Sequence, residues 1–534
     1  MSRPATSTMT IIYSNQSAAM GTGRRPDETP SQPVYRPSKC PDMASSNLEL
    51  FKTRKFRDLI AQRLSGLVQI PTVTYDEMGL LGEDARWQVF EKLPKFFERT
   101  FPRIYDAMEV LSINKYAFLF TWKGSDPSLK PLVFMAHTDV VPAPEETSDR
   151  WTYPPFSGHY DSEYIWGRGS EDDKSNVIAI LSAIDSLLIA GFKPSRTVVF
   201  AVGFDEEGGA PGGYGARCLA DHLLEAYGED GVELIFDEGI PGIEEHFGTE
   251  FALPATAEKG YLDVSITIDT AGGHSSTPPD HTAIGYLARI IQSIEENPFQ
   301  SRLTAENPTS TYLKTVALHA KDIPADLRKA ILDPRSADKV LKYMDNSPET
   351  RALIRTSTAV DVVQGGEKAN ALPETAHIIV NHRIAVEESV RTVKDYYVRH
   401  LSPLAKQWNF GLQGFGQKAS GNFKATITVA GHDALEPSPT SDPEDERFDW
   451  LTGTIRGVFG KDVVVAPVLL TGNTDTKFYW KLSSQIYRWS PWRASLDPRG
   501  TMMHTVDERM PVEGLLEMVR FYREFIRVVD EKRR

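Results

Sequence analysis

The sequence predicts an α/β protein in which a mostly parallel sheet forms the larger domain and a smaller α+β domain is inserted into it. Short apolar runs of strand type alternate with helical stretches over residues 132–236, as in parallel βαβ units. A β-α-β-β-α-β order follows at 262–432, which is typical of a two-layer α+β domain. The 534 residues are 40% hydrophobic, so the chain can bury the cores of about two to four domains.

The larger domain is expected at residues 47–261 and 433–534. It begins with amphipathic helices at 48–68 and 87–101. Apolar strands then follow at 132–136, 198–204 and 234–236, with helices at 177–189 and 216–227 between them. Residues 1–46 are rich in Ser, Thr, Pro and Arg without an apolar period, and we expect a disordered tail there.

The inserted domain is expected at residues 262–432. Its strands are predicted at 263–268, 358–363, 376–384 and 425–429, and its helices at 283–296 and 387–400. The polar stretch 297–357 carries short helical segments and is interpreted as a helical insertion in this domain. A run rich in Pro, Ser and acidic residues at 436–446 is interpreted as the linker back to the larger domain.

Composition excludes several classes of function. The net charge of −14 argues against a nucleic-acid footprint. Two cysteines, Cys40 and Cys218, are too few for a disulfide scaffold or a thiolate metal cluster. The most apolar stretch, 177–192, is interrupted by Asp185 and falls short of the roughly 20 residues that a membrane span needs. Because no signal sequence is recognised either, we expect a cytosolic location.

Each strand of the larger domain ends in groups that can bind metal. His137 and Asp139 follow the first strand, and two acidic clusters, 205–207 and 237–238, follow the others. Because ligands bind beyond the carboxyl ends of parallel strands, we expect these side chains to gather at one edge of the sheet. Zinc accepts His and carboxylate ligands, and a two-metal site also needs a carboxylate that bridges the ions.

Six motifs in a fixed order resemble the M20 family of di-zinc metallopeptidases, over nearly the whole chain after residue 47. They are His137-x-Asp139, Gly167-Arg168-Gly169 with Asp172-x-Lys174, Asp205-Glu206-Glu207, Asp237-Glu238-Gly239, Gly272-Gly273-His274 and Gly500-x-x-x-His504. Within that family, the long insertion and the segments 471–477, 486–491 and 504–508 look most like the carboxypeptidase S branch, which includes N-acyl amino acid hydrolases.

The resemblance implies a set of metal ligands. Asp172 would bridge two metals, His137 and Asp237 would complete one site, and Glu207 and His504 would complete the other. It also implies a cis peptide bond after the bridging aspartate. The ions are expected to be zinc, with cobalt or manganese as alternatives, because nitrogen and oxygen ligands suit all three.

Two further acidic residues receive roles from the same resemblance. Glu206 would act as the general base on the water between the metals, and Asp139 would orient the His137 ring. The choice of Asp237 over its neighbour Glu238 follows the pattern of the branch, and both residues stay candidates.

Substrate contacts are also implied by the resemblance. His274 would donate to the substrate carbonyl, which it does across the subunit interface in dimeric members, so a homodimer through the inserted domain is expected. Asn370, Arg383 and Gly472 match substrate-binding positions. The planar fork of Arg383 suits a free α-carboxylate.

The predicted function is therefore a metal-dependent amidohydrolase or carboxypeptidase that cleaves a peptide or N-acyl bond next to a residue with a free carboxylate. One alternative is an N-acyl amino acid hydrolase or synthase with a long apolar acyl group. Another alternative is a non-catalytic peptide-binding relative, although all the expected positions are filled.

Overall fold

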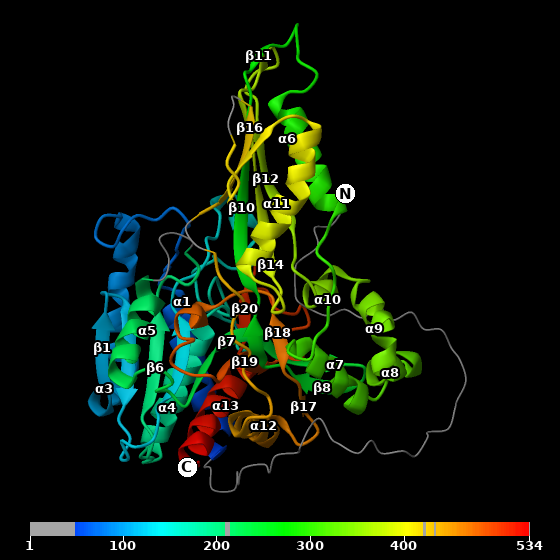
Figure 1. Ribbon diagram of the computed structural model, residues 1–534. Helices are drawn as coiled ribbons and strands as arrows, with labels where there is room; N and C mark the ends of the chain where they lie inside the picture. The colour runs from blue at the N-terminus through cyan, green and yellow to red at the C-terminus, as the bar shows by residue number, and fades with distance from the viewer. Residues whose placement is uncertain (1–47, 209–213, 420–422, 432–433, 533–534) are drawn as a thin grey trace.

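The computed structural model describes residues 48–208, 214–419, 423–431 and 434–532, so the expected N-terminal tail lies outside the described residues. Figure 1 shows a broad α/β body from which a second, narrower sheet projects. Within the described residues, the sheet of the body has ten strands and the projecting sheet has five. The predicted α/β fold is confirmed.

The central strands of the body are parallel. β3 (Leu132–His137) lies between β6 (Val198–Gly203) and β7 (Leu234–His246), and β19 (Ile486–Arg493) pairs with the other side of β7. The flanking strands are β1 (Glu109–Ile113), β2 (Ala117–Trp122), β8 (Thr249–Ala252), β9 (Ala255–Glu258), β17 (Val464–Val465) and β18 (Val468–Leu470). A small separate sheet joins β4 (His159–Tyr160), β5 (Tyr164–Trp166) and β20 (Arg509–Pro511). Every residue of β3 and β6 is buried, as expected for parallel strands covered on both faces.

Helices cover this sheet. They are α1 (Arg54–Val68), α2 (Leu93–Thr100), α3 (Pro102–Ala107), α4 (Lys174–Ile189), α5 (Tyr214–Tyr227), α12 (Glu446–Phe459) and α13 (Val512–Glu531). The apolar α4 is buried along almost its whole length, and its Asp185 forms ion pairs with Arg63 and Arg103 at 2.6 and 2.8 Å. Among the described residues, no helix combines the length and apolar character needed to cross a membrane.

The projecting sheet has the strand order β12 (Ala359–Gly365), β14 (Thr375–Ile384), β10 (Gly260–Asp269), β16 (Lys424–Val429) and β15 (Gly411–Gln413). Alternate residues of β10 and β14 are buried, and α6 (Ala283–Glu296) and α11 (Val390–Gln407) cover that face. Figure 1 shows β11 (Gly273–His274) at the far tip of this sheet, where it pairs with β13 (Ala371–Leu372).

The helical insertion packs on the body. It comprises α7 (Pro308–His319), α8 (Ala325–Leu332), α9 (Ala337–Met344) and α10 (Pro348–Ala352). Tyr312, Leu313 and Val316 of α7 share a core with Phe251 and Leu469 at the edge of the larger sheet. Of these helices, α7 lies against β9 and β18 of the body, and α8 packs on α7.

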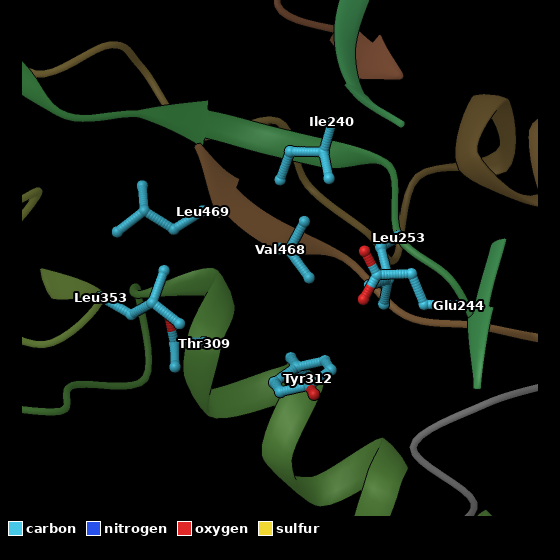
Figure 2. Close-up of a pocket in the computed structure, with 8 residues that line it drawn as sticks. All are labelled: Ile240, Glu244, Leu253, Thr309, Tyr312, Leu353, Val468 and Leu469. Carbon is cyan, nitrogen blue, oxygen red and sulfur yellow. The ribbon is translucent and has the colours of Figure 1, made fainter. Parts of the chain in front are cut away.

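A pocket lies between α7 and the sheet edge (Figure 2). Its empty space is about 390 Å³, counting the open mouth. The lining is mostly aliphatic and comprises Ile240, Glu244, Leu253, Thr309, Tyr312, Leu353, Val468 and Leu469. The insertion therefore supplies one wall of an apolar pocket and β7 and β18 supply the other.

Candidate metal centre

Six candidate residues reach the same edge of the larger sheet from different elements. His137 is the last residue of β3, Glu206 and Glu207 follow β6, and Glu238 lies on β7. Asp172 precedes α4, and its peptide bond to Asp173 is cis, as the resemblance implied. His504 lies on the loop before β20. The placement of His137, Glu206 and Glu207 follows from the parallel strands, whose carboxyl ends meet at one edge.

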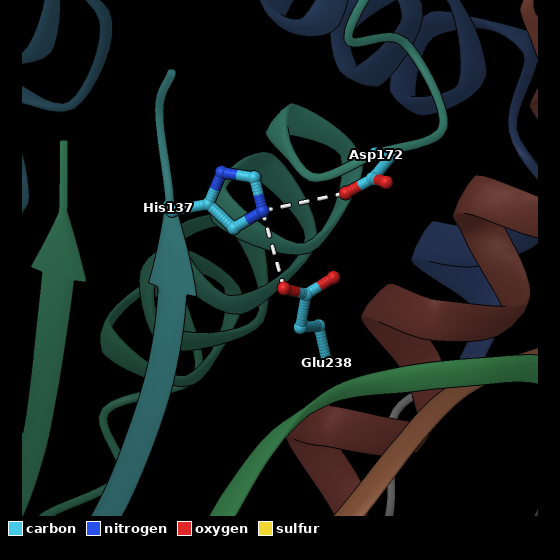
Figure 3. A group of neighbouring side chains, drawn as sticks. All are labelled: His137, Asp172 and Glu238. Atoms are coloured by element: carbon cyan, nitrogen blue, oxygen red, sulfur yellow. Dashed lines mark ion pairs between the residues drawn. The ribbon is translucent and has the colours of Figure 1, made fainter. Parts of the chain in front are cut away.

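The first group of side chains surrounds the His137 ring (Figure 3). Its Nε2 atom lies 3.3 Å from Asp172 Oδ1 and 3.1 Å from Glu238 Oε1. The His137 side chain is only 2% exposed. A nitrogen and two carboxylate oxygens thus converge in a buried position.

The second group surrounds the His504 ring. Its Nε2 atom lies 3.1 Å from Asp172 Oδ2 and 2.9 Å from Glu207 Oε1. The two oxygens of Asp172 therefore face different histidines, which is the arrangement that a bridging carboxylate requires. The His504 side chain is 52% exposed, so this group is the more open of the two.

Asp139 fixes the orientation of His137. His137 Nδ1 lies 3.1 Å from the Asp139 carbonyl oxygen and 3.3 Å from Asp139 Oδ1. The carboxylate also accepts hydrogen bonds from Thr74 Oγ1 and from the backbone N–H groups of Glu206 and Glu207, at 2.9 to 3.1 Å. It ties the ends of β3 and β6 together, and with Nδ1 held, Nε2 faces the carboxylates.

The buried acidic side chains around the two histidines shift one another's pKa values. Burial, together with neighbouring negative charge, raises the pKa of Glu206 and of Glu238 well above the usual range. Burial likewise raises the pKa of Glu207 to about 7. Hydrogen bonds to Asp172 and Glu207 raise the pKa of His504 to about 11. So many acidic groups around two imidazoles make a strong site for positive charge.

The side chains fit divalent cations. Buried His137 Nε2 has no hydrogen-bond partner, although two carboxylates lie within 3.3 Å. Among the described residues, three sets of side chains could each hold an ion: His137, Asp172 and Glu238; His137, Glu206 and Glu207; and Asp172, Glu207 and His504. The first and third share Asp172, and their nitrogen and oxygen donors suit zinc and similar cations.

Of the two candidates Asp237 and Glu238, the structure places Glu238 beside His137. Adjacent residues of a strand point to opposite faces, so only one of the two can face the histidine. The buried Asp237 side chain lies on the other side, near Thr474 and the buried ion pair of Arg488 with Glu258. Burial there raises the pKa of Asp237 to about 6.

Supporting residues also emerge that the sequence reasoning did not assign. Asp173 Oδ2 accepts a hydrogen bond from the His137 backbone N–H at 3.0 Å. Glu508 accepts hydrogen bonds from the backbone N–H groups of Glu171 and Asp172, at 3.0 and 3.2 Å. Both residues lie inside the motifs quoted above, but backbone partners of this kind leave no pattern in a sequence.

The candidate substrate residues fall in two places. His274 is exposed in β11, and the Asn370 carbonyl accepts a hydrogen bond from the Ser275 N–H at 3.4 Å, so both lie at the tip of the projecting sheet (Figure 1). Arg383 on β14 lies at the junction with the body and donates to Asn473 Oδ1 at 2.8 Å. Gly472 precedes that asparagine. Within this chain, the structure does not bring His274 or Asn370 to the metal-binding residues.

The chain is similar to known proteins in sequence and in fold. Residues 133–528 match the model of peptidase family M20/M25/M40. The chain is 42% identical to carboxypeptidase S of Saccharomyces cerevisiae over 496 residues, covering 89% of this chain and 85% of that protein. It is 32% identical to the human N-fatty-acyl-amino acid synthase/hydrolase PM20D1 over 489 residues, covering 90% and 89%.

The fold resembles solved structures as well. The crystal structure of human carnosine dipeptidase 1 superposes with a TM-score of 0.61 at 15% identity, covering 91% of this chain and all of that one. At this identity the likeness concerns the fold alone, and it supports the two-sheet architecture described above.

Proposed function

The chain belongs to peptidase family M20/M25/M40 and is a hydrolase of that family, and from this premise we propose that it cleaves a peptide or N-acyl amide bond next to a residue with a free α-carboxylate. Two divalent cations, zinc by preference, would be held around Asp172. The observation that carries this proposal is the position of Asp172, whose two oxygens lie 3.3 and 3.1 Å from the Nε2 atoms of His137 and His504. It is supported by the family match and by the similarity to carboxypeptidase S.

Five residues would hold the two ions. Asp172 would be shared, His137 and Glu238 would complete the buried site, and Glu207 and His504 would complete the open site. When bound, the cations would polarise the scissile carbonyl and lower the pKa of the attacking water. Asp139 would keep Nε2 of His137 pointing at the buried site.

Glu206 would move the proton. It follows β6 directly beside Glu207 and is within reach of His137, yet it belongs to neither of the two sets that share Asp172. Its carboxylate would accept a proton from the attacking water and deliver it to the amine nitrogen as the C–N bond breaks. The backbone N–H of Glu206 is fixed by Asp139 at 3.1 Å, which holds this base beside the ligands.

Arg383 would recognise the substrate carboxylate. Its guanidinium lies 5.0 Å from the centre of the Tyr261 ring and is bonded to Asn473, whose Nδ2 donates to the Lys259 carbonyl at 2.6 Å. The guanidinium is therefore held at the junction of the two sheets. A planar guanidinium fork suits a carboxylate better than an ammonium group does.

His274 and Asn370 would serve the centre of a second copy in a homodimer. They lie at the tip of the projecting sheet, away from the metal-binding residues of their own chain (Figure 1). The edge strand β12 is largely exposed, with Val363 at 59% exposure, and Ile284 of α6 is 44% exposed. An exposed edge strand with apolar side chains is a natural surface for pairing between copies.

N-acyl substrates form a second candidate class, favoured by the pocket in Figure 2. Ile240, which lines the pocket, lies on β7 two residues after Glu238. Two polar side chains of the lining are engaged with His246, which bonds Tyr312 and Glu244 at 2.7 and 2.9 Å, whereas the buried Thr309 hydroxyl has no hydrogen-bond partner among the described residues. The pocket would therefore suit an aliphatic group of the substrate. The similarity to PM20D1 supports the same class.

A hydrolysis screen tests the proposal. Metal-loaded full-length protein would be incubated with dipeptides, with the same dipeptides amidated at the C-terminus, and with N-acyl amino acids of increasing chain length. We expect release of free amino acids from substrates with a free carboxylate and slower turnover of amidated ones. Arg383→Ala should raise KM for substrates with a free carboxylate. It should therefore reduce the difference in turnover between free-acid and amidated substrates. Absence of turnover on every substrate would favour a non-catalytic peptide-binding relative.

A further inference from the structure

Two buried carboxylates cross-link the Asp172 segment to the loop that carries His504. Glu171 Oε2 accepts a hydrogen bond from the backbone N–H of Met502 at 2.9 Å. In the opposite direction, Glu508 Oε1 accepts from the backbone N–H groups of Glu171 and Asp172, at 3.0 and 3.2 Å. Each of the two segments thus accepts hydrogen bonds, through a glutamate side chain, from the backbone N–H groups of the other. The two contacts lie on either side of His504. We call the pair Glu171 and Glu508 the carboxylate clamp.

The clamp is buried and its Glu508 arm is charge-paired. Glu508 Oε2 accepts from Arg168 Nη1 at 2.5 Å, and both side chains are at most 4% exposed. The backbone also joins here, since the Gly167 N–H donates to the Glu508 carbonyl at 2.9 Å. Glu171 is buried as well, and its side chain accepts a hydrogen bond from the Met502 N–H. Removing one partner from such a buried network leaves the other group unsatisfied.

The two metal-binding groups depend on the clamp to different degrees. His137 is placed by β3, which has neighbours on both sides, and by Asp139. His504 has no strand or helix of its own, is 52% exposed and adopts a positive φ of 58°. Its position beside Asp172 and Glu207 therefore depends on how the ends of its loop are attached. Glu171 and Glu508 attach those ends.

We propose that Glu171 and Glu508 are positioning residues for the open metal site, holding His504 within reach of Asp172 and Glu207. The inference rests on the proposed function in one respect, namely that the centre binds two cations. Glu171 bonds only the His504 loop through its side chain, so its loss should weaken the open site selectively. Glu508 also holds the backbone of the shared Asp172, so its loss should weaken both sites.

Metal binding by the full chain tests the clamp directly. Wild type, Glu171→Met and Glu171→Gln would be titrated with Co²⁺, followed by absorption, and their zinc content measured at buffered free Zn²⁺. We expect Glu171→Met to weaken one of two sites by about 10- to 100-fold, the usual cost of losing an outer-shell partner, and to leave the other within about twofold. Glu171→Gln keeps an acceptor oxygen for the Met502 N–H and should restore most of the lost affinity.

Two further variants separate positioning from general destabilisation. Glu524→Gln alters another buried, arginine-paired carboxylate, on α13, and should leave both affinities unchanged. Glu171→Asp keeps a carboxyl group but shortens the reach of the side chain, so it should weaken the open site even if Glu171→Met does not fold. Glu508→Gln should weaken both sites.

The inference fails if Glu171→Met and Glu171→Asp bind two ions with wild-type affinities, or if they weaken both sites equally. A wild type that binds two ions with no turnover on any substrate would refute the proposed activity and leave the clamp intact. A wild type that never takes up a second ion would refute both.

Discussion

At the scale of single residues, the adjacent glutamates after β6 are predicted to divide two tasks. Glu207 lies 2.9 Å from His504, whereas Glu206 is outside the two groups that share Asp172. Glu206→Gln should keep both metals and lower kcat by about 10²- to 10⁴-fold, because an amide cannot accept the proton from water. Glu207→Gln should lower the affinity of one ion. Zinc content and steady-state kinetics of the two variants check this division.

An exchange of these phenotypes would exchange the roles. If Glu206→Gln lost an ion while Glu207→Gln kept both, Glu206 would be the ligand, as the set His137, Glu206 and Glu207 would allow. Equal metal content in both variants with equal, mild losses of kcat would leave neither glutamate as base or ligand.

A second prediction concerns the neighbouring acids of β7. Glu238→Ala should remove one ion, since Glu238 Oε1 lies 3.1 Å from His137 Nε2. Asp237→Asn should keep both ions, because this side chain lies on the opposite face near Thr474. Metal analysis after dialysis against buffered zinc measures both. Loss of an ion from Asp237→Asn alone would restore the original choice of Asp237.

The sequence could not decide between Asp237 and Glu238 for a physical reason. Alternation of polar and apolar residues tells which side of a strand faces water, but Leu234, Ile235 and Phe236 are all buried. A strand covered on both faces has no such alternation, so its phase at the last residues is undetermined. The strand ends that carry His137 and Glu207 followed from the pattern alone, whereas Asp172 precedes a helix and was assigned through the family resemblance.

At the scale of elements, the charge inside the apolar helix α4 has a structural role. Asp185 is paired with buried Arg63 at 2.6 Å and with half-exposed Arg103 at 2.8 Å. Asp185→Ala should lower the free energy of unfolding by about 3–5 kcal/mol, because it leaves the Arg63 charge buried without its partner. Arg103→Ala should cost about 1 kcal/mol or less, as for exposed pairs. Urea denaturation compares the two variants with wild type.

A larger loss of stability in Arg103→Ala than in Asp185→Ala would contradict the prediction that the buried pair of Asp185 with Arg63 contributes more. If Asp185→Ala unfolded at the same urea concentration as wild type while Arg103→Ala was destabilised, Arg63 would have another source of compensation. Metal content should stay unchanged in both variants, since none of the three residues belongs to the metal-binding sets among the described residues.

The elements differ in how far the sequence could predict them. The alternating strands β10 and β14 and the amphipathic helices α6 and α11 were visible because burial on one face imposes a period. The helices of the insertion were also visible, but not their position, because an apolar face predicts burial without naming the surface it covers. The pairing of β11 with β13 involves two residues in each strand, too few to show a pattern.

At the scale of the whole molecule, the two candidate substrate regions of one chain lie apart. The Arg383 region is at the junction of the sheets, whereas His274 is at the tip of the projecting sheet (Figure 1). The family resemblance identified Arg383 and His274 as candidate substrate residues. No sequence pattern indicates whether such residues meet within one chain or between two chains. The proposed homodimer corresponds to the second arrangement, in which each centre is completed by another copy.

Complementation between two inactive variants tests this arrangement. Glu206→Gln removes the base, and His274→Ala should lower kcat by about 10²- to 10³-fold, as loss of an oxyanion donor does. If His274 acts on the partner's centre, a mixed dimer contains one centre with both residues intact. Co-expression in equal amounts gives half mixed dimers with one working centre each, so activity should recover to about a quarter of wild type.

The single variants serve as controls for the co-expression experiment. Each variant expressed alone should stay inactive, and separately purified variants mixed without subunit exchange should stay inactive too. A double variant carrying both changes in one chain, co-expressed with wild type, distinguishes the arrangements further, because in its mixed dimers neither centre has both residues. About half of wild-type activity in that case, instead of the quarter that wild-type homodimers alone would supply, together with no recovery in the first experiment, would mean that His274 serves the centre of its own chain. The projecting sheet would then have to fold back onto the body.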